Sequence, residues 1–267
     1  MTSTTATPNA MPRGLRQVRR LPRLALLLAL AAGVLLAAGP LGWRAGWWHF
    51  RIGFSYLMPG AAYCGLAAIS VALVALFLGR RIRSARQIAI GVTALVIGAA
   101  SAYVPWHYYQ MRGTFPSIHD ITTDWDNPPQ FHAILPLRQA EGANPVAYEG
   151  AKISDQQRRA YPDIAPLMLE LAPTDAFDRA LKTAEQLGWT VVATDPPTAS
   201  GAGRIEASQK SRWFGFTDDV VVRIAPAESG SRVDIRSVSR MGRGDFGVNA
   251  TRVRAYLAAL RTAAPSR

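Results

Sequence analysis

The first 111 residues contain no aspartate or glutamate, although the whole chain of 267 residues has 18 acidic residues. Three runs in this region also lack lysine and arginine, and each is at least 20 residues long: Leu24–Trp43, Ile52–Gly79 and Gln87–Met111. A helix needs about 20 apolar residues to cross a hydrocarbon core that is about 30 Å thick. One such run could be a buried core helix, but three in succession without an acid predict a membrane anchor at 24–111.

Arginines are distributed unevenly around these runs, and their distribution predicts an orientation. Five precede the first run and four separate the second from the third, whereas only two separate the first from the second. The five before the first run are Arg13, Arg16, Arg19, Arg20 and Arg23; the four between the second and third runs are Arg80, Arg81, Arg83 and Arg86; and the two between the first and second runs are Arg44 and Arg51. Because cytoplasmic loops retain arginine and lysine, we expect residues 1–23 in the cytoplasm and residues 112–267 on the outer side of the membrane.

The predicted anchor leaves two questions open. The basic start and the apolar stretch after it are also compatible with a cleaved signal peptide, but the arginines at 80–86 would still place residues 112–267 outside. The runs carry no ionisable residue at depth, which argues against a transporter or channel. Ala94, Gly98 and Ala102 recur every four residues and would allow close helix contact. This contact would lie within the anchor or in a homodimer, so the oligomeric state stays open.

The first part of the exported half, residues 112–166, is predicted to be irregular. It contains seven prolines, and proline removes a backbone donor and interrupts helices and central strands. One short helix is expected at Asp155–Tyr161, with Ser154 as its cap.

The rest, 167–267, predicts strand, helix, four strands and helix, in that order. The expected strands are Leu167–Ala172, Trp189–Thr194, Arg204–Gln209, Asp219–Ala225 and Arg232–Ser239, and the expected helices run from a cap at Thr174 to Gly188 and over Val248–Leu260. Short turns between successive strands favour an antiparallel sheet with helices on one face, the α+β class. In the last strand Val233 and Ile235 are expected to face in, and Arg232, Asp234 and Arg236 to face out.

Three separated groups of residues in this half are similar to a known family. They are Ile118–Asp124 with Asp126–Pro129, Trp213–Phe216 with Asp218–Val220, and Ser237–Arg240 with Gly244–Asn249, Arg252 and Arg254. Together they resemble the bacterial domain-of-unknown-function family 1499 over about residues 115–263. The resemblance implies a domain that is often membrane-anchored and has relatives in plant plastids. It implies no activity.

An acidic segment offers the first candidate site. This segment holds His119, Asp120, Asp124, Asp126 and Asn127, and its aspartates and asparagine place oxygen ligands at short spacing, as Ca²⁺ or Mg²⁺ would require. An EF-hand loop that began at Asp120 would lack both its glycine and its final acid, so that motif fails. Capping of turns beside the prolines is the favoured interpretation, and a metal site or catalytic carboxylates are the alternatives.

A glycine-rich loop before the last helix offers the second candidate site. Its G-x-G-x-x-G spacing at 242–247 follows an antiparallel strand and precedes the final helix, so the dinucleotide fingerprint does not apply. Arg240 and Arg243 could hold an anion at the helix start. The favoured interpretation is a loop with positive φ angles, in which Asp245 or Asn249 caps the helix.

Other polar and aromatic residues have mainly structural interpretations. Trp213, Phe214 and Phe216 are expected to pack in the core, with a pocket or lipid contact as the alternative. Asp218 and Asp219 are expected to be turn and edge charges. Six arginines of the last elements are expected to form ion pairs, or else to contact anionic lipid or an acidic ligand: Arg223, Arg232, Arg236, Arg240, Arg252 and Arg254. The nearly neutral charge of residues 112–267 argues against nucleic acid.

These observations favour a non-catalytic binding module for an envelope partner or an anionic ligand, with no cofactor and no metal. Its expected contact residues are His119, Asp120, Asp124, Asp126, Arg240, Arg243, Asp245 and Asn249. The alternative is a carboxylate- or metal-assisted hydrolase that uses the three aspartates of the acidic segment. No G-x-S-x-G or H-E-x-x-H motif occurs, and the single cysteine, Cys64, lies within an apolar run.

Overall fold

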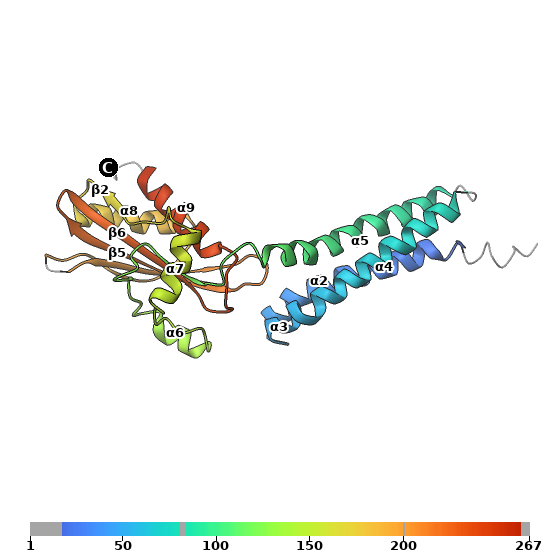
Figure 1. Ribbon diagram of the computed structural model, residues 1–267, viewed down its shortest axis with the longest axis horizontal. Helices are drawn as coiled ribbons and strands as arrows, with labels where there is room; N and C mark the ends of the chain where they lie inside the picture. Colours follow the sequence, from blue (N-terminus) through green and yellow to red (C-terminus); the bar gives the residue numbers. More distant parts are fainter. Residues whose placement is uncertain (1–17, 81–83, 200, 263–267) are drawn as a thin grey trace, which may run out of the picture. The chain divides into compact units, whose positions relative to one another are not determined.

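The computed structural model describes residues 18–80, 84–199 and 201–262. It divides into two compact units, Met1–Gln110 and Met111–Arg267 (Figure 1). Four of the arginines that support the predicted orientation, Arg13, Arg16, Arg81 and Arg83, lie outside the described residues.

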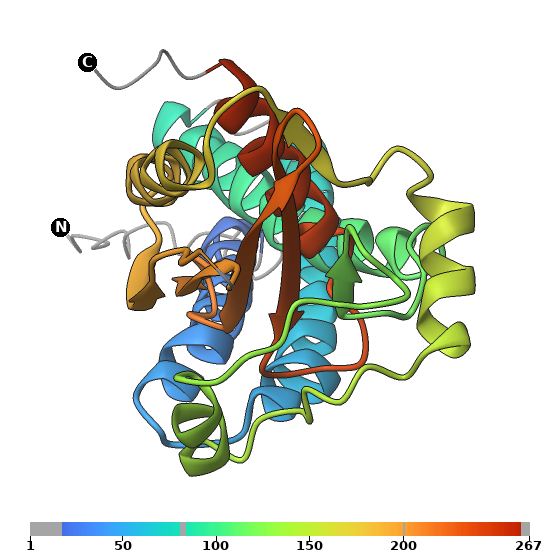
Figure 2. The ribbon, with the colours of Figure 1, turned by 90° about the vertical axis from the view of Figure 1, so that its left-hand side faces the viewer.

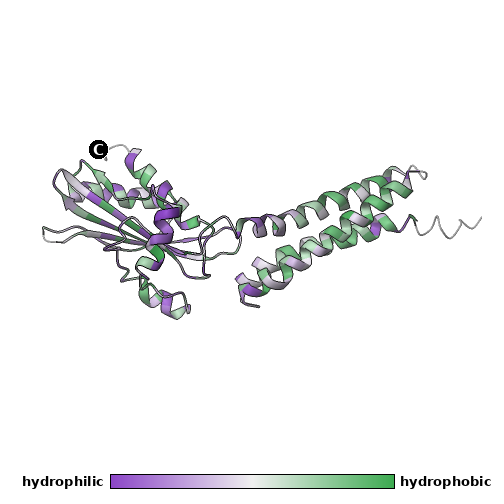
Figure 3. Ribbon diagram, in the orientation of Figure 1, coloured by the Kyte–Doolittle hydropathy of each residue, from purple (hydrophilic) through white to green (hydrophobic). Residues whose placement is uncertain are grey.

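The first unit consists of three long helices. They are α2 (Leu21–Arg44), α4 (Met58–Gly79) and α5 (Ala85–Met111), and the short helix α3 (Phe50–Ile52) and the π-helical turn η1 (Gly53–Leu57) continue directly into α4. Each of the three is long and apolar enough to span a membrane, as predicted. Figure 3 shows the corresponding concentration of hydrophobic residues along them. Their length and apolar character indicate association with a membrane.

Small residues allow α4 and α5 to pack closely. A Cβ atom at Gly65 would lie 2.7 Å from the carbonyl oxygen of Gly98, and a Cβ atom at Gly98 would lie 2.9 Å from that of Gly65. Ala68 and Ala94 are buried beside them. The small residues of α5 therefore serve contact within this unit, where close backbone approach is favourable.

The second unit is built on a six-stranded antiparallel sheet. Its strands are β1 (Asp120–Thr122), β2 (Leu167–Leu169), β3 (Thr190–Asp195), β4 (Gly203–Lys210), β5 (Thr217–Ala227) and β6 (Gly230–Ser239). The order is β1-β6-β5-β4-β3, and β2 also pairs with β6 beside β1. This architecture confirms the predicted α+β class and the five predicted strands. Strand β1 was not expected.

Helices α8 (Pro173–Gln186) and α9 (Val248–Thr262) cover one face of the sheet, as predicted (Figure 1). Between helices and sheet lies the main apolar core, to which Phe177, Val222 and Tyr256 contribute. The predicted cap at Thr174 is wrong: the cap position is Ala172, two residues earlier, so that α8 begins at Pro173 and has no side-chain cap. Proline suits this first position because the helix needs no hydrogen bond from its nitrogen.

The opposite face is covered by the proline-rich segment, which is less irregular than predicted. After β1 it forms α6 (Leu135–Ala140), which lies below the sheet in Figure 1, and α7 (Ala151–Ala160). Figure 2 shows α7 beside β1, where Gln157 hydrogen-bonds both backbone groups of Thr122. The predicted cap at Ser154 is wrong: α7 begins earlier, after Gly150, whose φ of 59° is readily adopted by glycine.

Covering both faces changes the environment of the charged residues in β6. Val233 and Ile235 face the helices, as predicted. Asp234 and Arg236 point to the other face, but both are fully buried, so the expectation that they face solvent is wrong. The alternation of a strand determines which face a side chain takes, but it does not reveal what covers that face.

Candidate functional site

The sheet face that the proline-rich segment covers carries a network of buried ion pairs. The predicted acidic segment is part of this network. Asp120 in β1 binds Arg236 in β6 through both carboxylate oxygens, at 2.9 Å from Nε and 2.7 Å from Nη2. The Arg236 guanidinium also donates to the carbonyl oxygen of Val146, and its Cζ lies 5.4 Å from the centre of the Tyr148 ring. Burial raises the pKa of Tyr148 to about 12, so this phenol stays protonated at neutral pH.

Asp124 lies in a second group of ion pairs. One of its oxygens accepts from Arg223 at 2.8 Å and from Arg232 at 3.0 Å, and both arginines also bind the buried Asp234. The other oxygen accepts from the backbone nitrogen of Asn127, which confirms the predicted turn capping. Two acids and two arginines therefore neutralise one another.

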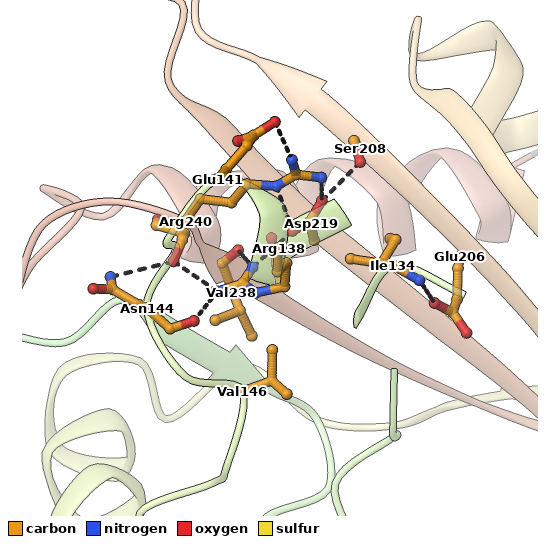
Figure 4. Close-up of polar contacts among 12 residues, drawn as sticks. Ile134, Arg138, Glu141, Asn144, Val146, Glu206, Ser208, Asp219, Val238 and Arg240 are labelled. Atoms are coloured by element: carbon orange, nitrogen blue, oxygen red, sulfur yellow. Dashed lines mark hydrogen bonds and ion pairs between the residues drawn. The ribbon is translucent and has the colours of Figure 1, made fainter. Parts of the chain in front are cut away.

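A third group links β5, the end of β6 and helix α6. Figure 4 shows Arg138 and Arg240 converging on Asp219. Asp219 is fully buried and accepts from Arg138 Nη1 at 2.7 Å, from Arg240 Nε and Nη2 at 2.8 Å, and from Ser208 Oγ at 2.7 Å. Glu141, half exposed, binds the remaining side of Arg240 at 2.7 Å. The expectation that Asp219 is an edge charge is wrong, because the proline-rich segment covers the strand entrance.

The two arginines of this third group experience different surroundings. Burial lowers the pKa of Arg138, and this effect outweighs its hydrogen bond to Asp219. The hydrogen bond to Asp219 raises the pKa of Arg240, helped by Glu141. Arginine remains protonated at neutral pH in either case. Two positive and two negative groups balance, so the cluster holds no surplus charge for a ligand.

Glu206 in β4 fixes the start of α6. Its side chain is fully buried and accepts from the backbone nitrogens of His132, Ala133 and Ile134 at 2.8, 3.2 and 2.9 Å. The sheet thus supplies an acceptor for the turn that leads into α6, a helix without a side-chain cap of its own. Arg204 forms an ion pair with the same carboxylate.

The glycine-rich loop between β6 and α9 has the conformation that the sequence favours. Gly242 and Gly247 adopt φ angles of 88° and 77°. Asp245 caps α9 by accepting from the backbone nitrogens of Gly247 at 3.0 Å and Asn249 at 2.6 Å. Burial raises the pKa of the Asp245 carboxyl, and these two hydrogen bonds oppose that rise. Arg243 is exposed.

Asn249 belongs to the helix-covered face. Its side chain accepts from Ser237 Oγ at 2.6 Å and donates to the carbonyl oxygen of His119 at 3.1 Å. Arg252 on the same helix binds Asp218 at 2.7 Å, so Asp218 is also a buried partner and not the predicted turn charge. His119 is half-buried and contributes its backbone oxygen to this contact.

The predicted contact residues therefore do not form one site. Asp120, Asp124 and Arg240 lie on the face that the proline-rich segment covers, whereas Asp245 and Asn249 lie at α9. Asp126 and Arg243 are exposed. Among the described residues, no three histidine, cysteine, aspartate or glutamate side chains gather closely enough to hold a metal ion.

The six arginines of the last elements form ion pairs, which confirms the favoured interpretation. Arg223 and Arg232 bind Asp124 and Asp234, Arg236 binds Asp120, Arg240 binds Asp219 and Glu141, Arg252 binds Asp218, and Arg254 binds Asp163.

The sequence analysis missed Arg138, Glu206 and Asp219 as members of the network. A signal was available in β4 and β5, where Glu206 and Asp219 occupy the face opposite to residues that pack under the helices. An acid on a strand face that is covered requires a partner. The aromatic turn between these strands was predicted in part: Phe214 is buried and stacks on Phe216 at 5.1 Å, whereas Trp213 is 59% exposed.

Comparison with known proteins adds a family but no activity. No curated protein and no solved structure matches the chain. The model of the family described as "Protein of unknown function (DUF1499)" matches residues 120–260, from the first residue of β1 to the last turns of α9. The match covers more than half of the chain and contains every strand of the sheet. The chain therefore belongs to the DUF1499 family of proteins of unknown function.

Proposed function

We propose that this protein uses its three apolar helices as an inner-membrane anchor and displays residues 112–267 in the periplasm as a non-catalytic binding domain for an envelope partner or an anionic ligand. The observation that carries the proposal is the pairing of the predicted acids. Asp120 is held by Arg236 and Asp124 by Arg223 and Arg232. A general base or nucleophile needs a carboxylate that can reach the substrate, and these carboxylates face their arginines inside the fold.

The orientation rests on the distribution of charge. The first 111 residues have no acid, and their arginines concentrate before the first helix and between the second and third. Arginine-rich short loops stay in the cytoplasm. An odd number of spans then brings the C-terminal domain to the opposite side.

A pair of reporter fusions at Arg267 tests this orientation. Alkaline phosphatase fused there should be active, and a cytosolic fluorescent protein at the same position should stay dark. The reverse result would refute periplasmic display. As a matched control, fusions at Arg80 should show the opposite pattern, because that residue directly follows the second predicted span.

The non-catalytic character is tested with Asp126, the acid of the segment that stays exposed. A hydrolase that uses the acidic segment would lose its function in D126N without losing stability. In D126N, a domain that binds its anionic ligand through Arg243 should keep the same set of molecules cross-linked to the full-length protein in intact cells. Arg243→Glu reverses an exposed charge at the β6–α9 loop and should change that set. If D126N abolishes a phenotype that R243E leaves intact, the hydrolase is favoured and the proposal fails.

A further inference from the structure

One end of the sheet gathers three segments that are distant in sequence. The β4–β5 turn (211–216) lies there because Gln209 pairs with Asp218, and the β6–α9 loop (240–247) lies there because Asp218 pairs with Ser239. Residues 112–119 enter β1 at the same end, since Asp120 pairs with Val238. We call this the Trp213 end of the domain.

The β4–β5 turn holds Trp213 outward on a well-ordered support. Ser211 accepts from Gly215 and Phe216, through its carbonyl oxygen and its hydroxyl, each at 3.0 Å. The ring of Phe214 is buried and stacks on Phe216. Trp213, between these fixed residues, remains 59% exposed. An indole in this position presents a large apolar face and one polar nitrogen, the combination that favours the headgroup level of a bilayer.

The charge at this end is positive. Lys210, Arg212 and Arg243 are exposed there. The acids nearby have partners within the domain: Asp218 binds Arg252, Asp219 binds Arg138 and Arg240, the half-exposed Glu141 binds Arg240, and Asp245 caps α9. The outward field of the Trp213 end therefore comes from its basic residues, which suits an anionic surface.

Few residues separate this end of the domain from the last helix of the first unit. The ring of Phe115 packs on Gly247, where a Cβ atom would lie 2.8 Å from the ring, and Ile118 accepts from the backbone nitrogen of Asp245 at 3.3 Å. Only three residues separate Phe115 from Met111, the last residue of α5. Four residue steps can span at most about 14 Å. The last turns of α5 contain Trp106, Tyr108 and Tyr109, residue types that concentrate at membrane interfaces.

We infer that the Trp213 end is an interfacial surface, which inserts Trp213 among the headgroups of the bilayer that holds the anchor and binds anionic lipid through Lys210 and Arg243. This inference rests on the proposed function and names the class of its anionic ligand. The short tether favours lipid over an acidic protein, because it holds the surface at a high effective concentration beside the headgroups.

Hydroxyl-radical footprinting of the full-length protein in nanodiscs tests the inference. One set of discs contains phosphatidylcholine alone, and the other contains one third phosphatidylglycerol. Trp213 should oxidise several-fold more slowly in the anionic discs, and high salt should reverse that protection. Met168 in β2 is an internal reference, because it is 56% exposed and pairs with Arg232, near the far end of β6. Its oxidation should be the same in both discs.

Charge reversal separates lipid binding from other causes of protection. The double variant K210E/R243E should lose the difference between the two discs. The matched control K182E/R261E reverses two exposed charges, on α8 and at the end of α9, and should keep it. Equal oxidation of Trp213 in both discs, or protection that survives K210E/R243E, would overturn the inference. Protection that needs added membrane proteins would assign this surface to a protein partner instead. None of these results alters the outcome of the fusions at Arg267, so the two proposals can fail separately.

Discussion

Replacing Asp219 with asparagine removes the negative charge at the centre of the buried network with little change in shape. The carboxylate has no exposed surface and accepts from Arg138, from both Nε and Nη2 of Arg240, and from Ser208. An asparagine would present an amide NH2 group to donors where an acceptor is needed. Arg240 would retain Glu141, but Arg138 would retain only backbone carbonyl oxygens, including those of Val238 and Ser239.

The expected cost follows from this loss of partners. Removing one member of a buried ion pair destabilises a protein by about 3–5 kcal/mol, because the other charge stays buried without compensation. Domains have a total stability of about 5–15 kcal/mol, so D219N should remove a large part of it. For a domain of about this size, each kcal/mol corresponds to a shift of roughly 2–4 °C in Tm. The D219N midpoint should therefore fall by about 6–20 °C.

The midpoint can be measured on the full-length protein in detergent as the temperature at which brief heating removes the protease resistance of the second unit. Cleavage within residues 112–267 reports on that unit alone. D195N is the matched control: Asp195 pairs with Arg204 but is 57% exposed, and surface pairs contribute less than about 1 kcal/mol. Adding Arg138→Leu to D219N should restore part of the loss, since it removes the orphaned charge. A D219N shift no larger than that of D195N would refute the view that the buried network stabilises the domain.

Three further changes test other parts of the fold. Glu206→Gln removes the carboxylate that caps α6, and should cost about 1–3 kcal/mol and accelerate amide hydrogen exchange over 132–140. Gly230→Ala should destabilise the domain by at least about 1 kcal/mol, because φ is 123° and a Cβ atom would lie 2.2 Å from a carbonyl oxygen of β2. The control Gly113→Ala should be neutral in the same heating assay, because Gly113 has open space around it. Asp245→Asn removes a carboxyl whose pKa is raised by burial. The folded state favours its protonated form, so the stability of the wild type relative to D245N should fall as the pH rises through that raised pKa, and a difference that grows with pH would contradict this assignment.

The membrane helices and most of the sheet could be predicted because their signals are local. A run of 20 or more uncharged apolar residues, such as Leu24–Trp43, specifies a spanning helix without reference to the rest of the chain. Strands β4 and β6 show alternation within their own sequence, β5 contains three successive valines, and the short β5–β6 turn specifies the antiparallel pairing of β5 with β6.

Strand β1 and the buried network escaped prediction because they depend on distant residues. Asp120 and Arg236 are 116 positions apart, and neither is recognisable as buried without its partner. The three residues of β1 are too few for a periodic pattern, and they are strand only because β6 pairs with them. Prolines correctly predicted the breaks in residues 112–166. They did not predict that the pieces between the breaks cover a sheet face.

The buried ion pairs explain how such a segment can cover the sheet in a single arrangement. An apolar cover would tolerate many positions, because hydrophobic contact has no direction. Three contacts here each require one geometry: the paired oxygens of Asp120 on Arg236, the Glu206 carboxylate on three successive nitrogens, and Asp219 between two arginines. Asn144 adds a fourth, because its backbone and side chain bind Arg240 and Gly242 in the β6–α9 loop. The proline-rich segment, which follows α5 in the sequence, is thereby hydrogen-bonded both to the middle of the sheet and to its Trp213 end. R243E and D219N should affect different properties, because Arg243 is exposed and Asp219 is fully buried: the first should change surface binding at constant Tm, and the second should lower Tm.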